Sequence, residues 1–294
     1  MKQVLLLIAL FCIICSSCEK AISFRLADTQ PSLVVEASIE NGQPPVVILS
    51  SSFDYFSSIS ADILAGSFVH NAVISMSNGA KTHQLKEYFY TTPANGKVYY
   101  YSIDSSSLAT AFTGAFNTAY ALSIAVNGKT YTANTTIPAF TKRVDSLWWK
   151  YAPDNPDSNK VVLVGTVTDP RGYGNYIRYF TKTNRDPFFP GLNSVFDDQV
   201  VDGKTYTVDV ERGVNRNEDI DQDNYSFFNK GDTITVKFAN IDKACYDFWR
   251  TMEYSYGSIG NPFASPTKVL GNINGALGYF GGYAAQYKSI IVPK

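Results

Sequence analysis

Hydrophobic and polar residues alternate in short segments from residue 33 onwards, and turn-forming residues separate these segments. Alternation with a period of two indicates strands that bury one face. Asn78-Gly79 and Asn127-Gly128 stand between such segments, and Asn-Gly favours a hairpin because both turn positions need positive φ. The segments are LVVEASIE, VVILSSS, SFVHNAVISMS, THQLKEYFY, YALSIAV and KTYTANTTIP. The pattern predicts a small immunoglobulin-like β-sandwich over residues 32–140.

A second series of strand-like segments begins after Pro138 and residues 141–143, which mark a domain boundary. In its first segment, VDSLWWKY, alternation places Trp149 on the more apolar face, so we expect Trp149 to be buried and Trp148 to be more exposed. Further strands are predicted over KVVLVGTVTDP, GNYIRYFTKTN, TYTVDVERG and DTITVKFAN. Together they predict a C-terminal β-rich domain over residues 141–294.

One stretch of the C-terminal segment has helical periodicity. Its apolar residues recur on one stripe: Ile241, Cys245, Phe248, Trp249 and Met252. The stripe predicts an amphipathic helix near residues 242–256, with Asp242 capping its start and Gly257 at its end. The predicted fold class is therefore mainly β, with two β-sandwich (immunoglobulin-like) domains and one amphipathic helix in the C-terminal domain.

The first twenty residues follow a different pattern. A positive residue precedes an unbroken apolar run over residues 4–14, and small residues lead to Cys18. As a helix, this run covers roughly 17 Å of a ~30 Å hydrocarbon core, so a cleaved signal peptide over residues 1–17 is favoured over a membrane span. Ser-Ser-Cys resembles the bacterial lipobox, although Cys15 stands where an aliphatic residue is usual.

The lipobox predicts that acyl chains such as palmitate are attached to Cys18 and that residues 18–31 form a lipidated tether. Two or more acyl chains hold a protein stably at a bilayer, whereas one chain holds it only marginally. An ordinary cleaved signal peptide, without a lipid, is the alternative.

Composition narrows the partners. The chain has 25 Lys and Arg residues against 26 Asp and Glu, so charge gives no reason to expect nucleic acid or an anionic bilayer surface as a partner. Once the signal peptide is removed and Cys18 is lipidated, Cys245 is the one cysteine left, and an intramolecular disulfide is impossible. We expect Cys245 to be a small buried hydrophobic residue of the predicted helix.

Asp219, Asp221 and Asp223 alternate along an acidic loop and could surround a calcium ion. The EF-hand pattern is not met, because Asn224 and Lys230 stand where that loop has its turn glycine and its bidentate glutamate. An irregular calcium site is a candidate, and a solvated acidic loop is the alternative. No other metal and no cofactor is predicted.

No catalytic residue is predicted. The histidines, His70 and His83, fall on predicted strands, and no G-x-S-x-G motif accompanies them, so nucleophilic and zinc catalysis are not expected. The sequence alone leaves a carboxylate-based hydrolase open, because many acid pairs could lie the required 5 to 10 Å or so apart.

Adjacent aromatic residues give a functional hint. Neighbours on a strand point to opposite faces, so some of these rings should be exposed, where they could stack on sugars or contact another protein. Packing in the core is the alternative. The residues are Tyr88-Phe89-Tyr90, Tyr99-Tyr100-Tyr101, Phe188-Phe189 and Phe227-Phe228.

Several short segments, in this order, carry a resemblance to one family. They are Cys18-Glu19-Lys20, LVVEASIENG, FVHNAVISM, NGKTYTANTTIP, VDSLWW, Gly174-Asn175-Tyr176, Gly231-Asp232-Thr233-Ile234, Asn261-Pro262-Phe263, Asn272-Ile273-Asn274-Gly275 and Gly278-Tyr279-Phe280. Through them the chain resembles a family of Bacteroidota lipoproteins known as a domain of unknown function (number forty-two forty-nine). The resemblance spans nearly the whole chain after the signal peptide.

The resemblance implies an outer-membrane lipoprotein of the kind often encoded beside TonB-dependent transporters. We therefore expect a non-enzymatic, lipid-anchored accessory or binding protein of TonB-dependent nutrient uptake, with a transporter and a small-molecule or glycan ligand as candidate partners. The alternatives are a structural or adhesive surface protein that binds other proteins, and a carboxylate-based hydrolase. Glu19-Lys20 lacks a longer acidic run associated with export, so the periplasmic and surface faces both stay open.

Overall fold

The computed structural model describes residues 31–53, 61–92, 96–153, 155–259, 261, 264–265 and 267–294. Ser32–Lys294 form one structural unit. The predicted signal peptide, Cys18 and the tether up to residue 30 lie outside the described residues, so the lipid anchor stays a prediction. Among the described helices, none is both long enough and apolar enough to cross a membrane.

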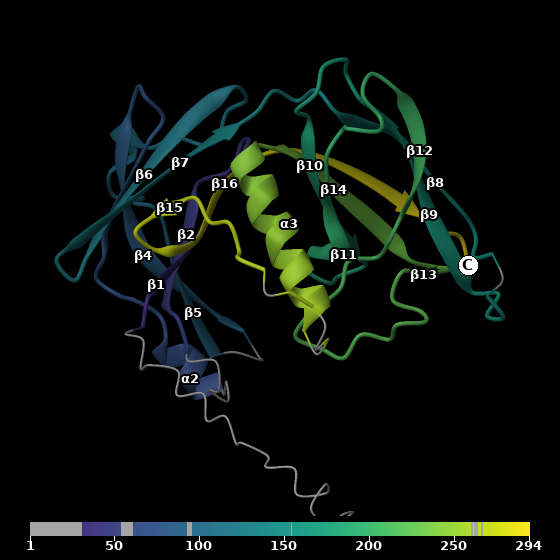
Figure 1. The fold of residues 1–294 in the computed structure, drawn as a ribbon, viewed down its shortest axis with the longest axis horizontal. Helices are drawn as coiled ribbons and strands as arrows, with labels where there is room; N and C mark the ends of the chain where they lie inside the picture. Colours follow the sequence, from purple (N-terminus) through teal and green to yellow (C-terminus); the bar gives the residue numbers. More distant parts are fainter. Residues whose placement is uncertain are drawn as a thin grey trace, which may run out of the picture. The chain divides into compact units, whose positions relative to one another are not determined.

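Twelve of the described strands pair into one sheet, in the order β11-β10-β14-β16-β1-β2-β5-β4-β3-β6-β7-β15 (Figure 1). Their bounds are β1 Leu33–Glu40, β2 Val46–Ser51, β3 Val73–Ser77, β4 Thr82–Thr92, β5 Gly96–Ile103, β6 Thr118–Val126, β7 Lys129–Ile137, β10 Tyr176–Thr183, β11 Phe189–Phe196, β14 Thr233–Ile241, β15 Ile273–Asn274 and β16 Leu277–Ile291. The mainly β class predicted from the sequence is confirmed.

A second, four-stranded sheet has the order β12-β9-β13, and β8 also pairs with β9. Its strands are β8 Arg143–Tyr151, β9 Lys160–Thr168, β12 Thr205–Val210 and β13 Phe228–Asn229. The described helices are α2 (Ala61–Gly66), a 3-10 turn (Leu108–Thr110) and α3 (Lys243–Ser258).

The last strand lies inside the large sheet and joins the N-terminal strands to the C-terminal ones. β16 pairs in parallel with β1 and antiparallel with β14. Gly278 permits this pairing, because its φ is +102° and a Cβ there would lie 1.9 Å from the carbonyl oxygen of Val35. A side chain would clash with that oxygen, and the backbone conformation itself favours glycine. The large sheet therefore continues past the boundary predicted after residue 140.

The side chains of β16 show how the sheet is packed. Phe280 and Ala284 enter a first hydrophobic cluster with β1 to β7, and Ile290 packs against a second cluster between β10, β14 and the four-stranded sheet. Tyr279 and Tyr283 belong to a third cluster, on the opposite face of the strand, with α3. The first cluster consists of residues before position 138 together with residues from the β15–β16 segment. The second cluster consists of residues after position 143. The division into two domains stays a prediction.

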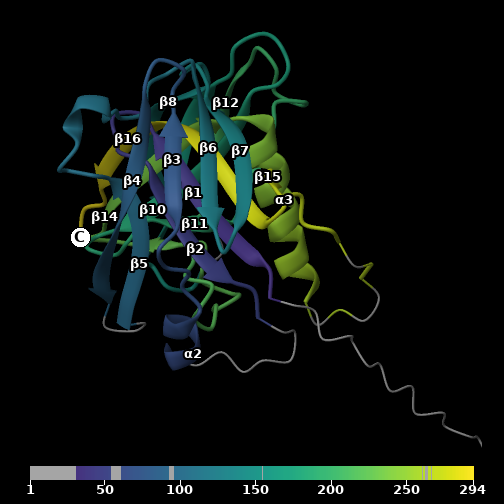
Figure 2. The ribbon, with the colours of Figure 1, turned by 90° about the vertical axis from the view of Figure 1, so that its left-hand side faces the viewer.

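The hairpins predicted from the Asn-Gly turns are present. β3 pairs antiparallel with β4, and β6 pairs antiparallel with β7. At the second turn, Asn127 and Gly128 have φ angles of 51° and 72°, as this turn requires. Figure 2 shows β3, β6 and β7 side by side, in their order within the sheet.

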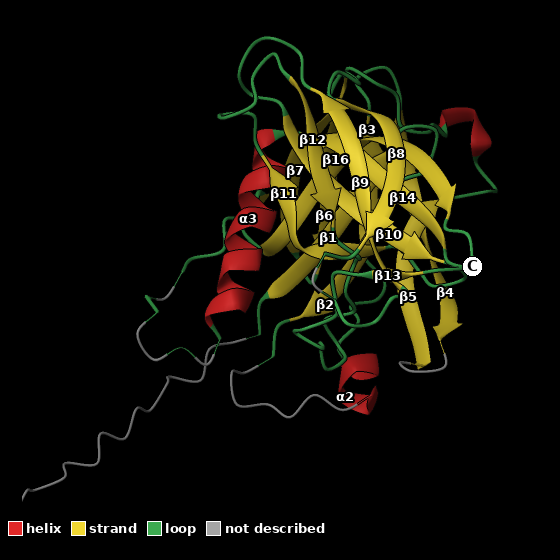
Figure 3. Cartoon of the chain, turned by 90° about the vertical axis from the view of Figure 1, so that its right-hand side faces the viewer, coloured by secondary structure: helices red, strands yellow, loops and turns green. Residues whose placement is uncertain are grey.

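Helix α3 lies against β10, β11 and β16, on the sheet face that carries the third cluster (Figures 1 and 3). Asp242 caps it as predicted, since its carboxylate accepts a 2.8 Å hydrogen bond from the backbone N–H of Cys245. The predicted end was wrong. The helix continues through Gly257 to Ser258, because Gly257 does not adopt the positive φ of a terminating glycine.

Strand β8 follows its predicted alternation only in part. Trp149 is only partly buried, against the second cluster, and Trp148 is 38% exposed, so the predicted order of exposure is confirmed. Strict alternation would put Val144 on the face of Trp148, yet Val144 is buried. A β-bulge between Val144 and Ser146 shifts the register and explains the difference.

Candidate functional site

A cavity of about 360 Å³ lies between α3 and strands of the large sheet; we call it the α3 pocket. Cavities of this size hold small molecules, especially where apolar walls carry a few convergent polar groups. The lining has that mixed character: Glu36, Ser38, Glu40, Arg178, Phe180, Pro190, Arg216, Lys237, Trp249, Met252, Glu253, Tyr256, Tyr279 and Tyr283.

Strand β1 supplies one side of the α3 pocket through its alternation. Every second residue from Val35 is buried in the first cluster, so Glu36, Ser38 and Glu40 project from the other face. The parallel register with β16 places Glu36 beside Tyr279. A row of polar residues in the middle of a large sheet therefore marks the pocket.

Arg178 of β10 provides a central charge of the α3 pocket. It is only 4% exposed. Its Nε donates a hydrogen bond to the Ser194 hydroxyl (3.2 Å), and its Nη1 donates one to the Tyr283 hydroxyl (3.4 Å). No carboxylate oxygen of a described residue lies within 4.0 Å of its guanidinium nitrogens. A guanidinium has five N–H donors and keeps its charge, so donors remain for an occupant of the pocket.

Aromatic rings orient this guanidinium. Its central carbon lies 3.3 Å from the ring centroid of Trp249 and 4.7 Å from that of Phe180. The Trp249 ring N–H in turn donates to the Tyr283 hydroxyl at 3.3 Å. Contact this close between the central carbon and the Trp249 ring favours a guanidinium plane that faces the ring, with its N–H groups acting along its edges.

Two carboxyl groups with raised pKa values line the same pocket. Burial raises the pKa of Glu253. Hydrogen bonds from the backbone N–H and hydroxyl of Ser194 lower it, as does the charge of Arg178, but these effects offset the rise only in part. Glu36 is accessible from the pocket, but the protein surrounds its carboxyl group. This restricted hydration raises the pKa of Glu36, while the charge of Arg178 lowers it. Both groups bind protons more readily than an exposed glutamate.

The other two cations of the pocket have partners within the protein. Lys237 pairs with Glu40, which also accepts a hydrogen bond from the Tyr287 hydroxyl. Arg216 donates to two backbone carbonyl oxygens. Among the described residues of the pocket, Arg178 is thus the cation that has neither a carboxylate nor a carbonyl partner.

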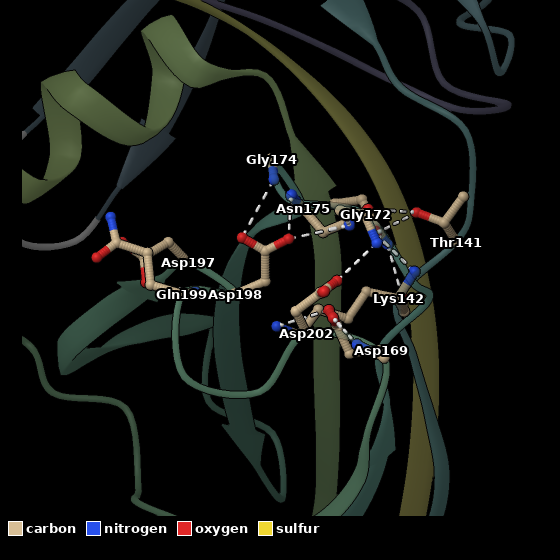
Figure 4. Close-up of polar contacts among 12 residues, drawn as sticks. Thr141, Lys142, Asp169, Gly172, Gly174, Asn175, Asp197, Asp198, Gln199 and Asp202 are labelled. Carbon is tan, nitrogen blue, oxygen red and sulfur yellow. Dashed lines mark hydrogen bonds and ion pairs between the residues drawn. The ribbon is translucent and has the colours of Figure 1, made fainter.

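A separate group of three carboxylates brings together Asp169, Asp198 and Asp202 (Figure 4). The backbone N–H of Gly172 donates to Asp202, and those of Gly174 and Asn175 donate to Asp198. Asp169 pairs with the fully buried ammonium group of Lys142 at 3.0 Å. Each carboxylate is therefore engaged by the protein, and Lys142 already brings a positive charge to the cluster. We therefore assign the three carboxylates a structural role, in which they hold the loops around residues 172 and 202 in place.

The structure does not gather the predicted calcium candidates into a comparable group. Asp221 accepts hydrogen bonds from the side chain of Asn224 and the backbone N–H of Asp223, and these bonds lower the pKa of Asp221. Asp219 is exposed. The group of metal-type ligands found among the described residues is the one around Asp198. A calcium site at Asp219, Asp221 and Asp223 stays a prediction.

The histidines and Cys245 have structural roles. His83 lies on β4, as expected, and is buried; its Nδ1 contacts the Thr110 hydroxyl, and its Nε2 accepts a hydrogen bond from a backbone N–H. The strand position predicted for His70 was wrong: it lies just before β3, where it bonds to Glu87 at 2.5 Å. Cys245 is buried as expected, and burial raises the pKa of its thiol to about 12.

The adjacent aromatic residues divide between core and surface. Tyr101 and Phe228 are buried. Phe89 and Tyr90 of β4 are 54% and 51% exposed. Tyr99 of β5 lies beside Phe89, with ring centroids 5.8 Å apart. The β4–β5 hairpin therefore exposes aromatic rings on both of its faces, and none of them lines the α3 pocket.

Sequence reasoning missed the α3 pocket. A usable signal was the acidic face of residues 33–40, which is unusual for a strand with neighbours on both sides. Trp249 was assigned to an apolar stripe, and nothing local marked Arg178 as buried. Two of its neighbours, Trp249 and Tyr283, come from α3 and β16, which are distant in the sequence.

Fold and pocket together define a mainly β protein in which one helix covers a sheet face and encloses a small-molecule-sized cavity. The chain belongs to the family of the domain of unknown function DUF4249, whose sequence model matches residues 19–289. A search of curated proteins finds no match. Membership of this family implies no particular activity, so the α3 pocket is the feature that bears on function.

Proposed function

We propose that this protein is a lipid-anchored binding protein of the bacterial outer membrane, which holds a small molecule in the α3 pocket and serves uptake through a TonB-dependent transporter. The observation that supports binding is the pocket itself: aromatic walls surround a buried cation that has donors to spare. This combination is typical of small-molecule sites.

The proposed anchor rests on the lipobox at Cys18, and the outer membrane and the transporter rest on the family resemblance. Residues 19–32 separate Cys18 from β1. A chain of this length spans at most roughly 50 Å when extended. The tether would therefore keep the pocket within reach of a transporter in the same membrane.

A structural or adhesive surface protein is the second candidate function. The exposed rings of Phe89 and Tyr90 favour it, because aromatic side chains are enriched where proteins meet. These rings and the α3 pocket lie on different strands, so substitution of Phe89 and Tyr90 by serine separates the two functions. Loss of partner binding with unchanged ligand binding would support adhesion.

A carboxylate-based hydrolase is the third candidate, since Glu36 and Glu253 line one pocket with raised pKa values. Glu253 argues against it, because both of its oxygens accept hydrogen bonds from Ser194. A general acid or nucleophile must reach the substrate directly. We therefore favour binding over hydrolysis.

Native mass spectrometry after incubation with the small-molecule fraction of spent growth medium tests the proposal. The wild-type lipoprotein, purified in detergent, should retain a compound through dialysis. Ser38→Phe should retain none, because Ser38 lines the pocket and a phenyl group there fills it. Ser123→Phe is the matched control, since Ser123 lies on β6 of the same sheet but does not line the pocket.

Retention by the wild type and by Ser123→Phe, with loss in Ser38→Phe, supports the proposal. The proposal fails if no compound is retained, or if Ser38→Phe retains it as well as the wild type does. Recovery of a hydrolysed product would favour the hydrolase instead.

A further inference from the structure

We infer that the ligand of the α3 pocket carries a carboxylate group, which binds along the edge of the Arg178 guanidinium, and a ring that lies against the aromatic walls. This inference rests on the proposed binding function and names the class of ligand.

The charge of Arg178 is the first argument. A buried guanidinium is costly unless a counter-charge and hydrogen bonds compensate it. The hydroxyl groups of Ser194 and Tyr283 occupy two donors but bring no negative charge. Glu36 and Glu253 act on Arg178 from beyond 4.0 Å, so neither forms an ion pair with it. A ligand carboxylate would supply the missing contact.

The geometry favours a carboxylate. The rings of Trp249 and Phe180 both lie close to the central carbon of the guanidinium, so its edge is the approach that they leave to an anion. Edge-on approach gives two parallel hydrogen bonds to the two oxygens of a carboxylate, as in Arg–carboxylate pairs.

The surrounding charges favour a monoanion over a phosphate dianion. Glu36, Glu40 and Glu253 line the pocket with Arg178, and Lys237 and Arg216 are engaged by the protein. One buried positive charge in reach of acidic side chains matches a single negative charge. A dianion would leave one charge uncompensated and close to these carboxyl groups.

The remaining walls select the body of the ligand. Trp249, Tyr256 and Tyr279 line the cavity, whose volume of about 360 Å³ admits a ring or a monosaccharide. Flat apolar and sugar rings both pack on aromatic faces. The class is therefore a carboxylate attached to a ring, such as an aromatic acid or an acidic sugar.

Isothermal titration calorimetry with matched pairs tests this class. The probes are phenylacetate against phenylacetamide, D-glucuronate against D-glucose, and inorganic phosphate, each added to the purified full-length lipoprotein in detergent. We expect the acid of at least one pair to bind about tenfold more tightly than its neutral partner, and phosphate to bind no better than that partner. A tenfold difference corresponds to the loss of one good charge-assisted contact.

Arg178→Lys supplies the second arm. It keeps the positive charge but removes the planar pair of donors, so the preference for the acid should fall to about threefold or less. The wild-type pairs do not depend on this variant and remain decisive if it is poorly folded. A preserved preference in folded Arg178→Lys would overturn the assignment of the carboxylate to Arg178.

The inference is also overturned if the neutral partners bind as tightly as the acids, if phosphate binds most tightly, or if none of the probes binds. In each case the proposed function stands as long as the wild type retains a compound from spent medium and Ser38→Phe does not. If the wild type itself retains no compound from spent medium, the binding function is overturned.

Discussion

The guanidinium carbon of Arg178 lies 3.3 Å from the centroid of the Trp249 ring, so a residue of the sheet and a residue of α3 meet across the pocket. A cation–π contact in a desolvated site contributes about 2 kcal/mol. The pair therefore helps to hold α3 on the sheet and also sets the plane in which Arg178 can bind an anion.

Removal of the Trp249 ring should destabilise the protein. We expect Trp249→Leu to lower the free energy of unfolding by roughly 2–4 kcal/mol, through lost packing and the lost contact with Arg178. Trp148→Leu is the matched control, because Trp148 is 38% exposed, and it should cost less than about 1 kcal/mol. Urea unfolding measures both, and equal losses would contradict a special role for Trp249.

Gly278 should tolerate no side chain, because a Cβ would lie 1.9 Å from the Val35 carbonyl oxygen. We expect Gly278→Ala to lower the free energy of unfolding by more than about 2 kcal/mol, because the added methyl group pushes β1 and β16 apart. Gly79→Ala controls for backbone strain alone: its φ is +85°, but nothing lies within 4 Å of the added Cβ. That variant should cost only about 1 kcal/mol. Similar thermal unfolding of the two variants would argue against the close approach of the strands.

Asp198 should make the protein acid-sensitive. Burial pushes the pKa of Asp198 upward, but hydrogen bonds from the backbone N–H groups of Asn175 and Gly174 and from the Asn175 side chain outweigh this, so the pKa is lowered. A carboxyl group with a lowered pKa in the folded state stabilises that state above its unfolded pKa of about 3.9, and this contribution is lost as pH falls through the folded pKa.

Asp198→Asn should therefore lower the free energy of unfolding by roughly 1–3 kcal/mol at pH 7 and by much less near pH 2, where the wild type has lost the same contribution. Chemical unfolding at a series of pH values measures the difference. The control is Asp219→Asn, since Asp219 is exposed and should leave the curve unchanged. If the free energies of unfolding of Asp198→Asn and the wild type differ by the same amount at every pH, the stabilising role of the ionised Asp198 is contradicted.

Local signals predicted the hairpins, while long-range contacts determined what the sequence did not reveal. The turn at Asn127-Gly128 follows from two residues that favour positive φ, and the cap at Asp242 follows from one side chain. The pairing of β16 with β1 joins segments that are more than 200 residues apart and depends on Gly278, whose contact with Val35 no local pattern reveals. The bulge near Val144 likewise depends on its partner strand.

The candidate site was harder to predict for the same reason. Sequence reasoning correctly treated Cys245 as a buried hydrophobic residue and expected some exposed aromatic rings. It could not assemble the α3 pocket, because Arg178, Trp249 and Glu36 come from three elements that pairing and helix packing bring together. Only the acidic face of β1 was visible locally.

The lipid anchor gives a prediction that does not depend on the pocket. If Cys18 carries the proposed lipid, Cys18→Ala removes the thiol to which it is attached, and the protein should move from the membrane fraction to the soluble fraction of the cell envelope. Cell fractionation and mass spectrometry of the mature N-terminus measure this. Cys245→Ala is the matched control and should leave the protein in the membrane. Unchanged membrane retention of Cys18→Ala would contradict the anchor.

Fluorescence of Trp249 tests the binding role of the α3 pocket most directly. The chain has three tryptophans, so Trp148→Phe together with Trp149→Phe leaves Trp249 as the reporter inside the pocket. Titration with the small-molecule fraction of spent medium should produce a saturable change in its emission, and Ser38→Phe should abolish that change. An emission spectrum that stays the same throughout the titration would contradict ligand binding in the α3 pocket.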